Sequence, residues 1–130
     1  MGAQPQTSRM VAQLVVALRL LADAPVAQLE WLARYLRDGH AQTEGDFPVE
    51  ELALQFEDAA QALPQFVEDG LLLREQERAV GEVTEQLSLM RDASRTHLWR
   101  AASLAADVEW VTVRRLANRA LASLEVGAAH

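Results

Sequence analysis

One segment near the carboxyl end, residues 98–124, is apolar on two opposite sides when it is drawn as a helix. At about 100° per residue, its main face collects Trp99, Ala102, Ala106, Trp110, Val113, Ala117, Ala120, Leu121 and Leu124. A second apolar strip, nearly opposite, contains Leu104, Val108 and Val111. A helix that is apolar on two sides needs a partner on each side. We therefore expect one long helix over residues 98–124, around which the rest of the chain packs.

The preceding sequence predicts three more helices and a short turn. An apolar run over residues 10–22 predicts a buried first helix. Pro25 and Gly39 suit the start and end of a second helix. Pro48 suits the start of a third, which Pro64 stops or bends, and Gly70 is expected to end one further turn. The expected core stripe of the second helix is Val26, Leu29, Leu32, Ala33 and Leu36.

Residues 71–91 predict a fourth helix with a heptad pattern. Its apolar seam, spaced alternately three and four residues apart, consists of Leu73, Gln76, Val80, Val83, Leu87 and Met90. Such a seam favours packing along a long neighbour that runs nearly parallel or antiparallel, and the last helix is the only one of comparable length. Gly81 lies in the middle of this helix. It either admits a close neighbour or marks a weak point.

Together these segments predict an all-α bundle of about five helices, of which the fourth and the last are long. Alternating patterns of strand length are not found in the sequence. We expect a disordered arm over residues 1–8, a single helical-bundle domain over residues 9–125 and a frayed tail over residues 126–130. The clearest loop covers residues 39–47, which contain two glycines and polar side chains.

Composition and motifs argue against several classes of function. The net charge is −7, and a nucleic-acid binder needs a basic surface. The chain has no cysteine, and its histidines are not spaced to place two metal ligands on one helical face. Gly-x-Ser-x-Gly and glycine-rich phosphate loops are absent from the sequence. We therefore expect neither an enzyme nor a cofactor. The first apolar run is too short to span a membrane. The absence of cysteine makes the reducing cytoplasm the simplest location.

Glu109 is an acidic residue on the main apolar face of the last helix. A buried carboxylate needs a cation or a hydrogen-bond donor, or else it takes up a proton. Three roles are open: a structural ion pair, a group that fixes the register between two chains, or an acid–base group in a pocket. Arg19, on the apolar first helix, is the first candidate partner.

Aromatic residues suggest a pocket between helices. Trp31 and Tyr35 lie one turn apart on the second helix, and Trp99 and Trp110 belong to the last one. The pair on the second helix is typical of a core edge. If the four rings meet beside Glu109, the chain would be a small-molecule-binding domain or an enzyme, and this is our alternative hypothesis for its function.

Our leading hypothesis is a helical protein–protein interaction and assembly module that acts as a homodimer. The interface candidates are Leu104, Val108, Val111 and Arg115, because the second strip can be buried across a two-fold axis. A third hypothesis rests on charge: over residues 44–85, the acidic residues greatly outnumber the two arginines, Arg74 and Arg78. This pattern suits an acidic inhibitor or immunity-type protein that binds a basic protein.

Overall fold

The computed structural model describes residues 5–37 and 49–128. The described residues form helices and connecting turns without a strand, which confirms the all-α prediction. The elements are α1 (Pro5–Ala22), α2 (Pro25–Arg37), α3 (Glu50–Ala60), α4 (Leu63–Glu68), α5 (Arg74–Leu89), a 3-10 helix η1 (Ala93–Trp99), α6 (Ala101–Ala106) and α7 (Val108–Ala128). The predicted loop at 39–47 lies outside the described residues. None of the described helices combines the length and apolar character that a membrane span requires.

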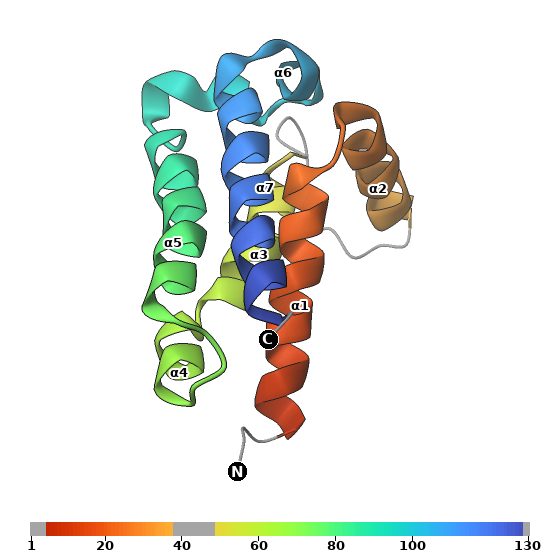
Figure 1. The fold of residues 1–130 in the computed structure, drawn as a ribbon. Helices are drawn as coiled ribbons and strands as arrows, with labels where there is room; N and C mark the ends of the chain where they lie inside the picture. The colour runs from red at the N-terminus through yellow and green to blue at the C-terminus, as the bar shows by residue number, and fades with distance from the viewer. Residues whose placement is uncertain (1–4, 38–48, 129–130) are drawn as a thin grey trace.

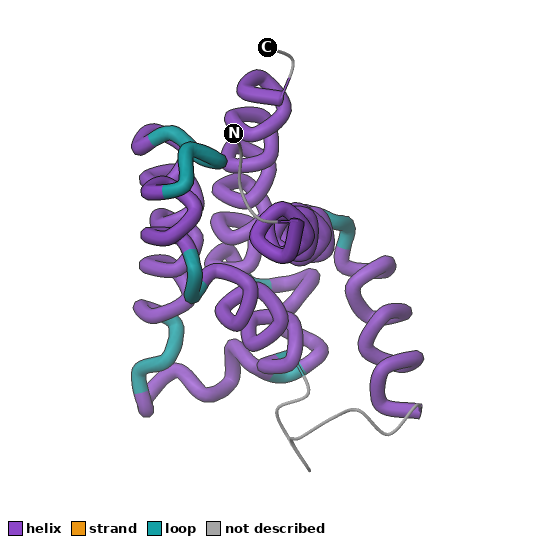
Figure 2. Tube along the Cα trace, turned by 90° about the horizontal axis from the view of Figure 1, so that it is seen from below, coloured by secondary structure: helices purple, strands orange, loops and turns teal. Residues whose placement is uncertain are grey.

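Four helices form the bundle, and α7 lies between two of them. It packs against α5 on one side and α1 on the other, and α1 in turn packs against α3 (Figure 1). The predicted pairing of the fourth helix with the last is therefore confirmed. In Figure 2 α1 is seen nearly end-on, and α2 stands to one side of the bundle. Helix α2 touches α3 and α6.

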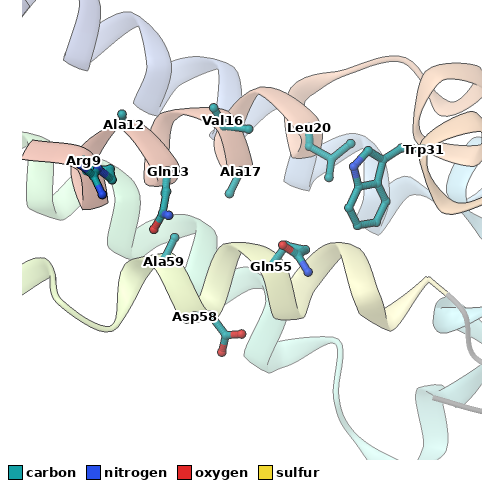
Figure 3. Close-up of a pocket in the computed structure, with 10 residues that line it drawn as sticks. All are labelled: Arg9, Ala12, Gln13, Val16, Ala17, Leu20, Trp31, Gln55, Asp58 and Ala59. Carbon is teal, nitrogen blue, oxygen red and sulfur yellow. The ribbon is translucent and has the colours of Figure 1, made fainter. Parts of the chain in front are cut away.

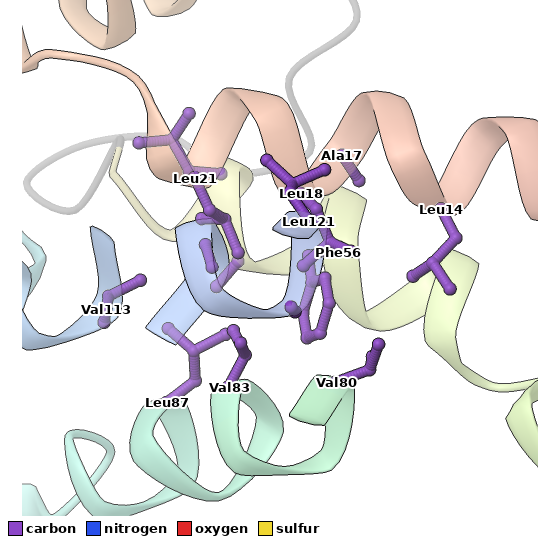
Figure 4. Packing of buried hydrophobic residues seen from close by; sticks show 14 of the residues in the cluster. Leu14, Ala17, Leu18, Leu21, Phe56, Val80, Val83, Leu87, Val113 and Leu121 are labelled. Carbon is purple, nitrogen blue, oxygen red and sulfur yellow. The ribbon is translucent and has the colours of Figure 1, made fainter. Parts of the chain in front are cut away.

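The core is built from the apolar stripes of these four helices (Figure 4). Leu14, Leu18 and Leu21 of α1 are fully enclosed. They face the buried residues of the other helices, which include Leu52, Phe56, Val80, Val83, Leu87, Trp110, Val113, Ala117 and Ala120. The stripes predicted for the fourth helix and the carboxyl-terminal half of the last one therefore form the core. Leu73 is the exception, at 64% exposure.

The segment predicted as one helix over residues 98–124 is broken in two places. Arg100 and Asp107 both have extended backbone, with ψ of 151° and 135°. The Asp107 side chain accepts a hydrogen bond from the Glu109 backbone N–H at 2.9 Å, so it caps a new helix, α7. The short helix α6 thereby turns away from the α7 axis. As a result Ala102 and Ala106, predicted on the main face, are exposed.

The helix ends also differ from the prediction. Helix α1 begins at Pro5, inside the predicted arm at residues 1–8, and at 18 residues it is longer than α5, which has 16. Helix α7 continues to Ala128, inside the predicted tail at residues 126–130. The long helices are therefore α1, α5 and α7 rather than two alone.

Helix α2 packs through a different face from the predicted one. Val26 is 67% exposed, and Leu29 and Ala33 also lie at the surface. Leu32 is buried, as predicted, but its buried companion is Gln28. The Gln28 amide donates hydrogen bonds to the Leu20 and Leu21 carbonyls at 3.0 and 3.1 Å. These carbonyls lie in the last turn of α1, where few helical N–H donors remain, so the Gln28 side chain ties α2 to the end of α1.

The turn after α3 follows the sequence closely. Helix α3 ends at Ala60, and Pro64 lies in the first turn of α4. Gly70 has a φ of +76°, and its N–H donates to the Val67 carbonyl at 3.1 Å. The Leu71 N–H donates to the Phe66 carbonyl at 2.9 Å. These two bonds form the Schellman motif that glycine favours after a helix.

Candidate functional site

The outer face of α7 carries three of the four predicted interface residues. Val108 and Val111 are 70% and 51% exposed, and Arg115 is also exposed. Leu104 is fully buried, because the break at Asp107 moves it from the predicted strip into the core. We call the surface formed by Val108, Val111 and Arg115 the α7 outer face. It lies opposite the side of α7 that packs on α1 and α5.

The arginines near this face have different surroundings. Arg119 forms an ion pair with Glu82 of α5, with 3.6 Å between Nη1 and Oε2. Arg114 donates to Gln28 Oε1 at 3.4 Å, and burial lowers the pKa of its guanidinium. Arg115 forms no ion pair with a described residue. Glu82 belongs to the acidic stretch over residues 44–85, so part of that acidic stretch pairs with a basic residue of the same chain.

Glu109 is not enclosed in the core. Its side chain is 23% exposed and forms an ion pair with Arg95 of η1, whereas Arg19, the partner suggested by the sequence, is exposed. Arg95 also donates to the Leu89 carbonyl at 3.5 Å. Glu109 therefore joins the start of α7 to the turn that follows α5, which is a structural arrangement.

The structure encloses a different carboxylate, Glu51 of α3, which is only 2% exposed. Sequence reasoning places it in the first turn of its helix, where an acid favours the positive end of the helix dipole. An interaction with the helix dipole does not require the carboxylate to be buried. The one sequence signal for the burial of Glu51 is its position directly before Leu52 and Ala53, which are both fully buried.

A second ion-pair cluster ties the end of α5 to α3. Arg91 makes a two-pronged contact with the Glu57 carboxylate, and its Nε lies 3.9 Å from Glu50. The hydrogen bonds to Glu57 raise the pKa of Arg91. The guanidinium carbon also lies 5.1 Å from the centre of the Trp99 ring. These contacts hold this corner of the fold together.

The four aromatic residues predicted to line one pocket form two separate pairs. Trp31 and Tyr35 stack with ring centroids 4.8 Å apart, and Trp99 meets Trp110 edge to face at 5.6 Å. Trp99 and Trp110 are buried in the core. Trp31 lines the cavity described next, and Tyr35, Trp99 and Trp110 are not among its lining residues. The predicted pocket around Glu109 is therefore not formed as proposed.

The cavity beside Trp31 is a groove of about 670 Å³ between α1 and α3. We call it the α1–α3 groove. Figure 3 shows Arg9 and Gln13 toward one end and Trp31 at the other. Its lining consists of Arg9, Ala12, Gln13, Val16, Ala17, Leu20, Trp31, Gln55, Asp58 and Ala59. The sequence pointed to Trp31 alone, because the groove joins helices that are distant in the chain.

A second cavity, of about 550 Å³, lies between α5 and the α3–α4 turn. Glu57, Glu77 and Glu85 lie along it, together with Gly81. Glu57 is already paired with Arg91.

Within the described ranges, no group of three His, Cys, Asp or Glu side chains is placed to hold a metal ion. No protein-family model, curated protein or solved structure matches this chain.

Proposed function

We propose that this protein is an interaction module that assembles as a two-fold homodimer through the α7 outer face. The observation that carries the proposal is the exposure of Val108 and Val111, at 70% and 51%, one turn apart on the same helix face. Fully burying one such side chain is worth about 1.5–3 kcal/mol. A second copy of the same surface would remove both valines from water.

The charges on α7 favour an antiparallel pairing. In a two-fold contact, if one residue faces a second residue of the partner subunit, that second residue also faces the first residue of the partner. If the axis passes beside Val111, positions four residues before and after it face each other across the interface. Asp107 then faces Arg115 of the partner subunit, and the symmetry repeats the pair. Asp107 is only partly exposed, at 25% of its side chain, while Arg115 has no described carboxylate partner.

Sedimentation equilibrium across a wide concentration range tests the assembly. We expect the mass of a dimer for the natural protein and of a monomer for the double variant Val108→Asp, Val111→Asp, with unchanged helical circular dichroism. Val26→Asp is a matched control, because Val26 is 67% exposed on α2; it should leave the dimer intact. A natural protein that is monomeric throughout, or a double variant that dimerises equally well, would refute the proposal.

The charge pair is tested without disturbing the fold. Asp107→Asn removes the charge but keeps an oxygen that can cap α7, and Arg115→Gln removes the opposite charge. Exposed pairs contribute about 0.2–1 kcal/mol each, so either variant should weaken the dimer a few-fold. Added salt should weaken the natural dimer more than either variant. Equal salt dependence in all three proteins contradicts the antiparallel pairing while leaving the valine contact standing.

A further inference from the structure

The α1–α3 groove changes character along its length. Arg9 and Gln13 give it a polar end, and Figure 3 shows the side chain of Leu20 and the Trp31 ring at the far end. Val16 lies between them and is 64% exposed. From Arg9 to Leu20 the helix advances about 16 Å. The groove therefore extends along α1 from a cationic end to an end where Leu20 and Trp31 supply apolar surface.

Arg9 is available to bind an anion. It is exposed and forms no ion pair with a described carboxylate. Asp58, the acid that also lines the groove, is not within ion-pair distance of it, and Figure 3 shows the Asp58 carboxylate pointing away from α1. A guanidinium binds a carboxylate through charge-assisted hydrogen bonds. The charge at this end therefore selects a negatively charged head group.

The apolar end is held in place by neighbouring side chains. The Trp31 ring stacks on Tyr35, and the Tyr35 hydroxyl accepts a hydrogen bond from the Gln55 amide at 3.3 Å. Ala17 and Ala59 are small, so they leave room between the two helices. The volume, about 670 Å³, falls in the range of small-molecule sites.

We propose that the α1–α3 groove binds a free medium-chain alkyl carboxylate. Its head group contacts Arg9, and its chain runs past Val16 and Leu20 to the Trp31 ring. A single cation at one end matches a single carboxylate. The α7 outer face contributes no residue to the groove, so this binding is independent of the proposed dimer.

Dodecanoate, kept below the concentration at which it forms micelles, is the probe. We expect saturable binding by calorimetry together with a change in tryptophan fluorescence. Trp31→Phe should abolish the fluorescence change while calorimetry still detects binding. Arg9→Gln should weaken binding about tenfold, and dodecanol should bind the natural protein about as weakly as dodecanoate binds this variant.

Ala12→Phe blocks the groove from an exposed position of α1 and should eliminate binding without unfolding the chain. Val108→Asp, on the α7 outer face, is the control and should bind dodecanoate normally. The proposal is overturned by absence of saturable binding, or by equal affinity in the natural protein and the Ala12→Phe variant. It is also overturned if Ala12→Phe changes only the oligomeric mass, since the groove would then be a protein contact.

Discussion

Trp99 and Trp110 meet edge to face, with ring centroids 5.6 Å apart and ring planes at 87°. Each buried indole N–H donates to a backbone carbonyl: Trp99 to Met90 at 3.0 Å, and Trp110 to Leu98 at 2.7 Å. Met90 follows the end of α5, and Leu98 belongs to η1. The two rings therefore fasten the segment in which the chain reverses between α5 and α7.

Replacing Trp110 by Phe should lower the free energy of unfolding by about 1–3 kcal/mol. The substitution leaves the buried Leu98 carbonyl without its donor and adds a small cavity. Urea unfolding followed by circular dichroism measures the change. Trp31→Phe is the matched control, because Trp31 is only half-buried on α2, and it should have a smaller effect. Equal losses in the two variants would mean that the indole bond to Leu98 does not stabilise the reversal.

Gln28→Leu should also destabilise the protein, by about 1–3 kcal/mol. The variant introduces an apolar side chain of similar size and leaves the Leu20 and Leu21 carbonyls without the amide donor. Hydrogen exchange should accelerate most in α2, because Gln28 ties this helix to the end of α1. Gln61→Leu, at an exposed glutamine, is the control. Unchanged exchange in α2 would contradict this role.

Gly81→Ala should raise the stability of the fold by about 0.5–1 kcal/mol. A Cβ atom at this position would meet no atom within 4 Å, and alanine has the higher helix propensity. Of the two explanations that the sequence left open, the structure supports a weak point rather than a close neighbour. Thermal and urea unfolding should both shift upward. A lower stability of Gly81→Ala would contradict this explanation and would mean that a methyl group in the cavity beside Gly81 is unfavourable.

Gly70→Ala should have the opposite sign. A Cβ atom there also meets nothing within 4 Å, but the φ of +76° costs an ordinary residue about 1–2 kcal/mol. The loss therefore reports backbone conformation alone. Gly70→Asn should recover part of it, because asparagine tolerates this conformation better than alanine. Equal stability of the Ala and Asn variants would contradict the explanation.

Asp92 should titrate below the usual range of an aspartate. Its carboxylate accepts hydrogen bonds from the Ser94 backbone N–H and hydroxyl, at 2.9 and 2.7 Å, which lower its pKa. A lowered pKa in the folded state means that the carboxylate's contribution to stability is present above the unfolded-state pKa. It is lost as the pH falls through the folded-state pKa.

The titration of Asp92 can be followed by carbon NMR of its carboxyl group. Ser94→Ala should move the pKa upward only in part, because the backbone N–H, the larger cause, is retained. Ser88→Ala, at another exposed serine, should leave the titration unchanged. A pKa that returns fully to the ordinary value in Ser94→Ala would contradict the dominance of the backbone donor.

Part of the candidate site was predictable from sequence. Val108, Val111 and Arg115 share one side of a helix because the helical period places them there, and the structure keeps them on that side. Leu104 could not be assigned correctly, because its place depended on a helix that Asp107 interrupts. The α1–α3 groove left no sequence signal beyond Trp31, since its two walls come from separate segments.

The sequence by itself determined the all-α class and which stripes on α5 and on the carboxyl-terminal half of α7 enter the core. It also determined the turn at Gly70. These features depend on periodicity and backbone preference, which are local properties. Only the tertiary structure decided that Glu109 pairs with Arg95 and that Gln28 is buried in place of Val26. Those outcomes depend on which donors and acceptors are left unsatisfied where helices end, and the chain brings such groups together only when it folds.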